Sequence, residues 1–228
     1  MFELRKICKS FGNLRVLKSI SLKIKSGIVT GLIGPNGSGK TSLVNIMSGI
    51  YPIDSGQILL DGNDISGATS YQISRLGVFR TFQHIRIFER MTVIENVISA
   101  MISHESFSFY GLLAQVRNPE DPKVKIAHNI LEIMEMENDS NLFAGDLTLP
   151  KRRRLEIARA LARDPKVILL DEPAGGMTPK ETESLAHLIN KNVAPGRTCL
   201  VIEHKMDLIA EVCEDLCVIN YGEKIAQG

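Results

Sequence analysis

The chain lacks several features that would assign it to common classes of protein. It contains no Trp, and aromatic residues make up only 5% of its 228 residues, so it offers few flat side chains on which bases could stack. Its 27 basic and 26 acidic residues leave a net charge of +1, which does not indicate a polyanionic partner. We therefore expect no nucleic-acid ligand.

Signals for membrane insertion, secretion and zinc binding are also missing. The sequence has no run of about 18 apolar residues, the length that indicates a membrane-spanning helix, and Met1–Lys6 lacks an apolar signal core. Cys213 and Cys217 lie close together, but no second Cys or His pair has metal-binding spacing. Cys199 and Cys217 fall in predicted strands, so we expect buried thiols in a reducing compartment.

Strand and helix patterns alternate along the chain, which at 44% hydrophobic residues suits one globular domain with a sizeable core. Apolar runs and alternation predict strands at 2–7, 20–25, 28–33, 57–62, 78–83, 167–170, 198–203, 216–219 and 224–226. Capping boxes and helical periodicity predict helices from 42, 92, 124, 152, 178 and 206. Residues 105–122 are the least ordered part, and roughly 84–150 forms a helical lobe inserted into an α/β fold.

A glycine-rich loop carries the strongest functional signal. Gly34-Pro35-Asn36-Gly37-Ser38-Gly39-Lys40-Thr41 has the form G-x-x-x-x-G-K-T, after a predicted buried strand and before a predicted helix. Three glycines let successive backbone N–H groups point at a phosphate chain, and the helix adds the positive end of its dipole. We expect Lys40 to reach the β- and γ-phosphates and Thr41 to bind Mg²⁺. An ordinary glycine turn is the alternative.

A second signal is the apolar strand 167–170, which ends in Asp171 and Glu172. In a P-loop fold this strand is expected to lie beside the strand that feeds the glycine loop, so Asp171 would hold the Mg²⁺ shell. Glu172 would point to the γ-phosphate and polarise a water molecule. By themselves, the two residues could equally be solvated acids at a strand end, but the upstream loop favours function.

Three further observations depend on context. His204 leaves the strand 198–203, where it could contact the γ-phosphate, although a lone His is more often structural. Phe11 lies at a predicted turn and could stack on adenine, but periodicity alone favours a packing role. The predicted helix at 152–163 carries arginines away from its apolar face, a pattern that usually marks a solvated surface; they are Arg152, Arg153, Arg154, Arg159 and Arg163.

Taken in order, these motifs resemble the ATP-binding cassette (ABC) ATPases over essentially the whole chain. The segments 88–97, 153–161 and 203–206 resemble the ATPase subunits of branched-chain amino acid-type importers. The resemblance implies a P-loop NTPase fold with a RecA-like mixed sheet, an N-terminal antiparallel β subdomain and a helical subdomain at about 84–150, inserted between 1–83 and 151–228. Family members usually continue beyond the position of Gly228.

The resemblance also implies roles for individual residues. Phe11 stacks on adenine, Gln83 senses Mg²⁺ and the transmembrane partner, Glu172 is the catalytic base, and His204 is the switch histidine. Mg²⁺ contacts Thr41, Gln83 and Asp171. Residues 175–178 cross a dimer interface. The nucleotide contacts comprise Phe11, Gly34, Pro35, Asn36, Gly37, Ser38, Gly39, Lys40, Thr41, Ser42, Gln83 and Asp171, with Thr148 serving the ATP of a partner subunit.

One segment departs from the family pattern. Where the family has L-S-G-G-Q or L-S-Y-G-Q, this chain has Leu147-Thr148-Leu149-Pro150-Lys151. Pro150 removes a backbone N–H, although proline suits the first turn of a helix. We expect an altered but working loop in which the N–H groups of Lys151 and Arg152, the helix dipole and the Lys151 charge favour phosphate; the alternative is a loop that no longer closes.

The function implied is an ATPase subunit of an importer, peripheral on the cytoplasmic face of the cell membrane. Its partners would be a second cassette, identical or not, permease subunits that contact the helical lobe around 84–105, and indirectly an extracytoplasmic solute-binding protein. Branched-chain amino acids or related small polar solutes are the expected cargo. A low-activity regulatory cassette or an ABC ATPase outside transport remain the alternatives.

Overall fold

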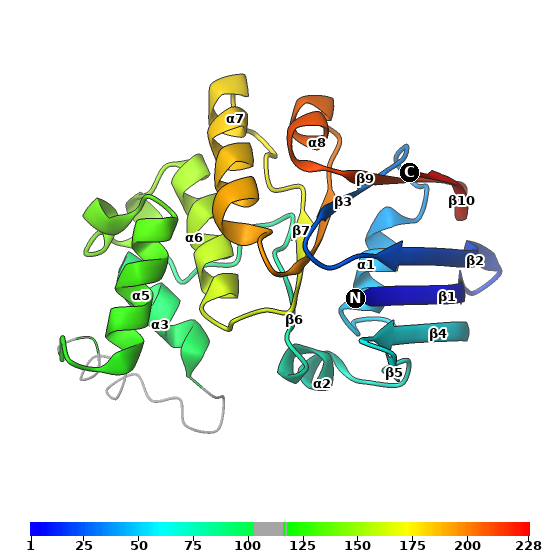
Figure 1. Ribbon diagram of the computed structural model, residues 1–228, viewed down its shortest axis with the longest axis horizontal. Helices are drawn as coiled ribbons and strands as arrows, with labels where there is room; N and C mark the ends of the chain where they lie inside the picture. The colour runs from blue at the N-terminus through cyan, green and yellow to red at the C-terminus, as the bar shows by residue number, and fades with distance from the viewer. Residues whose placement is uncertain (103–115, 117) are drawn as a thin grey trace.

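Two sheets and a group of helices follow one another along the longest axis of the molecule (Figure 1). The computed structural model describes residues 1–102, 116 and 118–228, so the expectation that 105–122 is the least ordered part falls largely outside the described residues. The α/β class expected from the sequence is confirmed. Among the described helices, none is both long and apolar enough to cross a membrane.

The first sheet is antiparallel and lies at one end of the molecule, on the right in Figure 1. Its strand order is β2 (Leu14–Ile24), β1 (Phe2–Phe11), β4 (Ser55–Leu60) and β5 (Asn63–Asp64). The predicted alternation is confirmed at Ile20, Leu22 and Ile24 of β2, which are buried in one core with Phe2 and Leu4 of β1. In β1 it breaks between Leu4 and Ile7, where the register with β2 shifts.

The second sheet is mixed and has six strands. Strands β9, β3, β8, β7 and β6 are parallel to their neighbours, and only the pairing of β10 with β9 is antiparallel. Strand β8 lies between β3 and β7, so the expectation that β7 directly neighbours β3 is wrong. The order is β10 (Glu223–Gln227), β9 (Asp215–Asn220), β3 (Val29–Ile33), β8 (Thr198–Ile202), β7 (Val167–Asp171) and β6 (Val78–Arg80).

The helices begin close to where their capping signals predict. The capping boxes at Thr92 and Thr178 are both formed, whereas a third at Thr69 was missed in the sequence, although Gln72 completes it. The described α-helices are α1 (Lys40–Met47), α2 (Ser70–Arg75), α3 (Val93–Met101), α5 (Pro122–Ile133), α6 (Leu149–Leu161), α7 (Pro179–Leu188) and α8 (Met206–Val212), and a π-helical turn, Ile189–Val193, follows α7.

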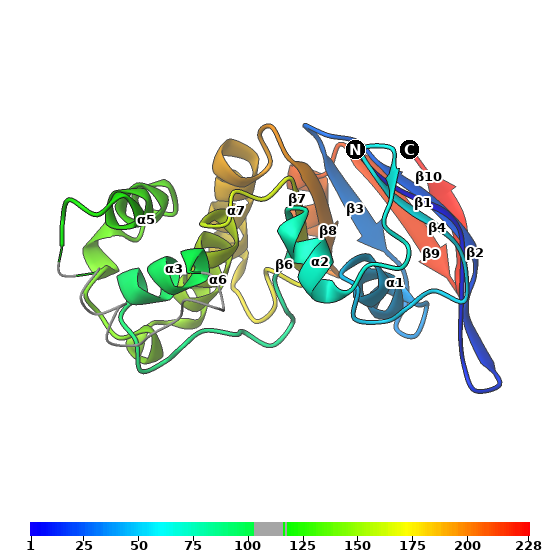
Figure 2. The same ribbon diagram turned by 90° about the horizontal axis from the view of Figure 1, so that it is seen from below.

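Two hydrophobic clusters hold these layers together. One lies between the sheets and encloses Leu43 and Met47 of α1. The other joins Val97 of α3 and Leu155 of α6 to the opposite face of the six-stranded sheet, so the helices shown on the left of Figures 1 and 2 share a core with that sheet. Cys199 is buried as expected, and burial raises the pKa of its thiol to about 12.

Helix α3 begins with a capping box that supports a stability prediction. Glu95 N–H donates to Thr92 Oγ1 at 3.3 Å, and Thr92 N–H donates to Glu95 Oε2 at 2.7 Å. Thr92→Ala removes the first bond and should lower the free energy of unfolding, measured in urea, by about 1 kcal/mol. Thr92→Ser keeps the hydroxyl and should unfold like the parent chain. Equal losses in both variants would contradict the capping role.

Candidate functional site

The glycine loop joins the end of β3 to the start of α1, as its sequence predicts. Gly39 precedes α1 with φ +106, in the left-handed region that favours glycine. At Gly34, an added Cβ would lie 2.1 Å from the carbonyl oxygen of Ile219, so no side chain fits there. Pro35 and Asn36 lie at the exposed tip of the loop, together with Gly37. The backbone therefore curves tightly in front of the helix.

The start of α1 presents backbone donors to this curve. The first helical hydrogen bond runs from Leu43 N–H to Gly39 O at 2.9 Å. The amides of Lys40, Thr41 and Ser42 precede that bond and have no acceptor within the helix. Together with the positive end of the helix dipole, they favour an anion such as phosphate.

The Lys40 ammonium lies within the loop. Its Nζ donates to Gly34 O at 2.7 Å and to Pro35 O at 3.0 Å. Burial lowers the pKa of Lys40, while the charges of Glu172 and Asp171 act in the opposite direction. Within the described residues, the buried Ser38 Oγ has no hydrogen-bond partner. A cation and a spare hydroxyl in a cradle of amides suit a polyphosphate.

Three side chains predicted for the γ-phosphate side meet one another. Gln83 Nε2 donates to Glu172 Oε2 at 3.0 Å, and His204 Nε2 lies 3.2 Å from Glu172 Oε1. Glu172 itself has φ +49, and its side chain is 26% exposed while that of His204 is 43% exposed. The carboxylate is therefore oriented by two neighbours and still open to water.

Asp171 has a partner that the sequence analysis missed. Arg80 Nη2 donates to Asp171 Oδ2 at 2.6 Å, with side-chain exposures of 6% and 7%. Arg80 Nη1 also donates to Asn45 Oδ1 at 2.5 Å, and it lies 3.4 Å from Ser48 Oγ. Arg80 thus ties the end of β7 to helix α1. The signal in the sequence was an arginine inside the apolar run 78–83.

The residues that would hold Mg²⁺ fit that ion by their chemistry. Thr41, Gln83 and Asp171 supply hydroxyl, amide and carboxylate oxygens, which are the ligands that Mg²⁺ prefers. Magnesium is commonly held by one or two protein ligands together with phosphate oxygens. This donor set meets that requirement.

Phe11 lies where β1 turns into β2 and is 42% exposed. Its ring meets Tyr51 edge-on with centroids 5.1 Å apart, and Lys9 Nζ lies 5.5 Å from the ring centroid. The same hairpin approaches the glycine loop, because a Cβ on Gly39 would lie 2.8 Å from Leu17 Cδ2. The exposed ring of Phe11 is available for stacking, on a hairpin that touches the loop through Leu17.

The altered loop at 147–151 leads into α6. Thr148 precedes the helix and makes no side-chain capping bond, which leaves its hydroxyl available. Two expected phosphate donors are otherwise engaged: Arg152 N–H donates to Thr148 O at 2.9 Å, and Lys151 Nζ pairs with Asp139 Oδ1 at 2.7 Å. The expectation that the Arg152 amide faces a phosphate is therefore wrong, because the helix uses it. The phosphate role of Lys151, whose side chain is 45% exposed, stays a prediction.

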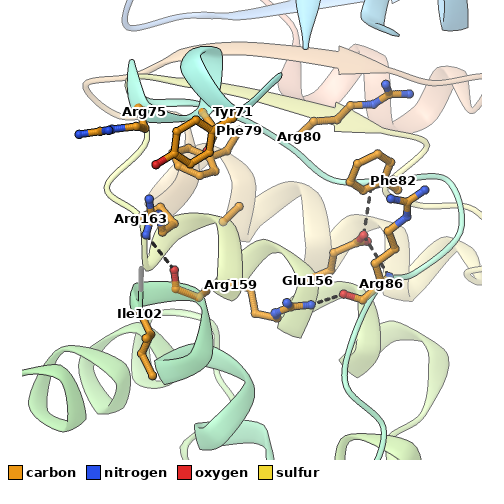
Figure 3. A pocket seen from close by; sticks show the side chains of 13 residues that line it. Tyr71, Arg75, Phe79, Arg80, Phe82, Arg86, Ile102, Glu156, Arg159 and Arg163 are labelled. Atoms are coloured by element: carbon orange, nitrogen blue, oxygen red, sulfur yellow. Dashed lines mark hydrogen bonds between the residues drawn. The ribbon is translucent and has the colours of Figure 1, made fainter. Parts of the chain in front are cut away.

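A cleft of about 590 Å³ lies between β6 and α6 (Figure 3). Its lining includes Glu156, aromatic rings such as that of Phe82, and five arginines. Arg86 Cζ lies 3.9 Å from the centroid of the Phe82 ring. The solvated face expected for the α6 arginines is wrong at Arg153, which is 6% exposed, and at Arg159, whose pKa is lowered by burial. The arginines that line the cleft are Arg75, Arg80, Arg86, Arg159 and Arg163.

Glu203 has a structural role that the sequence did not predict. Its buried carboxylate accepts hydrogen bonds from the N–H groups of Ala174 at 2.9 Å, His204 at 2.8 Å and Lys205 at 3.1 Å. It therefore fixes the backbone at His204 relative to the segment that follows Glu172.

Comparison with known proteins places this geometry in context. A family model described as ABC transporter matches residues 17–175. The chain is 38% identical to the high-affinity branched-chain amino acid transport ATP-binding protein BraF of Pseudomonas aeruginosa, with 100% of this chain and 91% of that protein covered. It is also 38% identical to the corresponding protein LivG of Escherichia coli K12, with 96% and 87% covered.

A solved structure has the same architecture. The ADP conformation of an ATP-binding cassette from an ABC transporter superposes with a TM-score of 0.87 at 31% identity, covering 100% of this chain and 90% of that chain.

The buried pair of Arg80 and Asp171 supports a second stability prediction. Arg80→Met leaves a buried carboxylate without its cation, so the free energy of unfolding should fall by about 3 kcal/mol or more. Urea denaturation measures this loss. Adding Asp171→Asn removes the remaining charge and should recover part of it. If the double variant loses the sum of both single losses, the pairing does not account for the effect.

Proposed function

Since the chain belongs to the ABC transporter family, we propose that it is the ATP-hydrolysing subunit of an importer. The observation that carries the proposal is that Gln83 and His204 both contact Glu172, whose charge in turn acts on Lys40 of the glycine loop. The names of the two relatives refer to branched-chain amino acid transport, so the proposed cargo is these amino acids or related small polar solutes.

ATP in this proposal lies along the loop 34–42, with Phe11 stacked on adenine and Lys40 at the β- and γ-phosphates. Thr41, Gln83 and Asp171 would hold Mg²⁺, which would supply positive charge to offset that of the phosphates. Glu172 accepts a proton from the water that attacks the γ-phosphorus, and the bond to the β-phosphate oxygen breaks to leave ADP and phosphate. Gln83 and His204 orient the carboxylate of Glu172.

A second cassette, identical or different, completes each site in the proposed assembly. Thr148 and the start of α6 face the nucleotide bound to that partner, and residues 175–178 lie at the interface. The accessible Thr148 hydroxyl supports this role. Closure on ATP and release after hydrolysis shift the pair between two states.

Permease subunits dock on this chain from the membrane. The cleft with five arginines lies between the proposed core, 1–83 and 151–228, and the proposed helical subdomain, 84–150, and suits a cytoplasmic segment of a permease. The subunit is peripheral on the cytoplasmic face of the membrane, and an extracytoplasmic solute-binding protein acts through the permease.

A regulatory cassette with low turnover is the second candidate. Pro150 in the altered loop and the pairing of Lys151 with Asp139 favour it, because both reduce the donors offered to the partner's phosphate. Single-turnover hydrolysis with and without the permease distinguishes the two functions.

Glu172→Gln tests the catalytic base. The amide keeps one acceptor oxygen where the carboxylate offers one each to Gln83 and His204, and it cannot take a proton, so hydrolysis should fall by about 100-fold or more while ATP affinity is retained. Phosphate release and equilibrium nucleotide binding measure the two effects, and the exposed Glu183→Gln is the control. Unchanged turnover would remove Glu172 from this role.

Lys40→Ala tests the phosphate cradle. Loss of the buried ammonium should weaken ATP binding by about tenfold or more, since a hydrogen bond to a charged group contributes about 1.5–3 kcal/mol. Titration with a fluorescent ATP analogue measures the affinity, with the exposed Lys180→Ala as the control. An unaltered affinity would count against the proposed site.

A further inference from the structure

Two side chains of α6 hold the backbone on either side of Gln83. Arg153 Nη1 donates to Phe82 O at 2.8 Å, and its Nη2 donates to Gln83 O at 2.7 Å. Glu156 Oε1 accepts from Phe82 N–H at 3.0 Å and from Arg86 N–H at 3.4 Å, as the dashed lines at Glu156 show (Figure 3).

These contacts suit the chemistry of both groups. The planar guanidinium of Arg153 presents two donors to two successive carbonyls, while the carboxylate of Glu156 accepts from two amides. Arg153 Nη1 lies 3.4 Å from Glu156 Oε2, and the two side chains are only 8% and 7% exposed. The positive charge of the one therefore offsets the negative charge of the other. Buried groups with this many polar partners hold one backbone geometry, because each unmade bond is costly.

The same helix begins at the loop proposed to serve the partner's nucleotide. Thr148 and Arg153 are five residues apart, which corresponds to about 7.5 Å along a helix. Arg154, the next residue, turns elsewhere, donating to Glu135 Oε2 at 2.8 Å and to Ser184 Oγ at 2.8 Å. Arg153 thus reaches the Gln83 carbonyl itself, whereas Glu156 holds the amides of Phe82 and Arg86 on either side of it.

We propose that Arg153 and Glu156 are positioning residues for hydrolysis, which fix the Gln83 backbone so that its amide meets Glu172. They also join the loop offered to the partner's nucleotide to the carboxylate that acts on this chain's own nucleotide. The inference rests on the proposed function for the roles of Gln83 and Glu172.

Amide hydrogen exchange in the full chain tests, independently of catalysis, whether Glu156 holds the backbone on both sides of Gln83. Glu156→Ala should speed exchange at Phe82 and Arg86 by about tenfold or more, because both amides lose their acceptor. Glu156→Gln keeps an acceptor oxygen and should retain most of the protection. Exchange that is unchanged in Glu156→Ala overturns the proposal.

A double-variant cycle tests whether Arg153 acts through Gln83. Arg153→Met should lower kcat by about tenfold or more with little change in KM. In a chain that already carries Gln83→Ala, the same substitution should lower kcat only slightly further. Arg154→Met is the matched control and should leave hydrolysis unaltered. If Arg153→Met lowers kcat by the same factor in both backgrounds, Arg153 does not act through Gln83; this result overturns the inference but leaves the proposed function intact. If Gln83→Ala alone leaves kcat unchanged, the proposed role of Gln83 is wrong, and the inference is wrong with it.

Discussion

Strand β7 ends at Asp171 and Glu172 follows directly, so two adjacent carboxylates with different surroundings lie at this junction, on which the rest of the site depends. Asp171 is buried against Arg80, whereas Glu172 lies half-buried between Gln83 and His204. Directly after the strand, Glu172 has a left-handed conformation, φ +49, in which its carboxylate contacts Gln83 and His204. Such a conformation costs about 1–3 kcal/mol, so the surrounding contacts must stabilise it. One of them is the hydrogen bond from Glu172 N–H to Ile202 O at 2.9 Å.

The order of strands explains how these groups meet. The glycine loop follows β3, His204 follows β8, Glu172 follows β7 and Gln83 follows β6, and these four parallel strands are neighbours in that order. Their carboxyl ends share one edge of the sheet, where ligands of open α/β sheets bind. With β8 between β3 and β7, His204 comes next to Glu172 on the side of the loop. Had β7 paired directly with β3, His204 could not take that position.

The sequence predicts features that depend on near neighbours and misses those that depend on distant ones. The glycine loop, the buried run of β7 and the caps at Thr92 and Thr178 are local patterns, and the structure has them all. The pair of Arg80 with Asp171 joins residues 91 positions apart, and the bond from Arg153 to Gln83 spans 70. A side chain's partner across such a separation is set by strand order and helix packing, which no local spacing encodes. For this reason the α6 arginines looked like a solvated surface.

The altered loop at 147–151 still leads directly into a helix, but it offers few free donors. Pro150 fits the first turn of α6, so the helix still starts at this loop and keeps the positive end of its dipole there. Asp139 neutralises Lys151, and the helix uses the Arg152 amide. What remains for a phosphate is the Thr148 hydroxyl with the amides of Leu149 and Lys151. In the proposed assembly, weak closure of this loop on the partner's nucleotide would reach Glu172 of the same chain, because Arg153 of α6 holds the Gln83 carbonyl. In a dimer of identical cassettes, both sites would then be slowed together; beside a different cassette, the alteration would act directly at the partner's site and through α6 at this one.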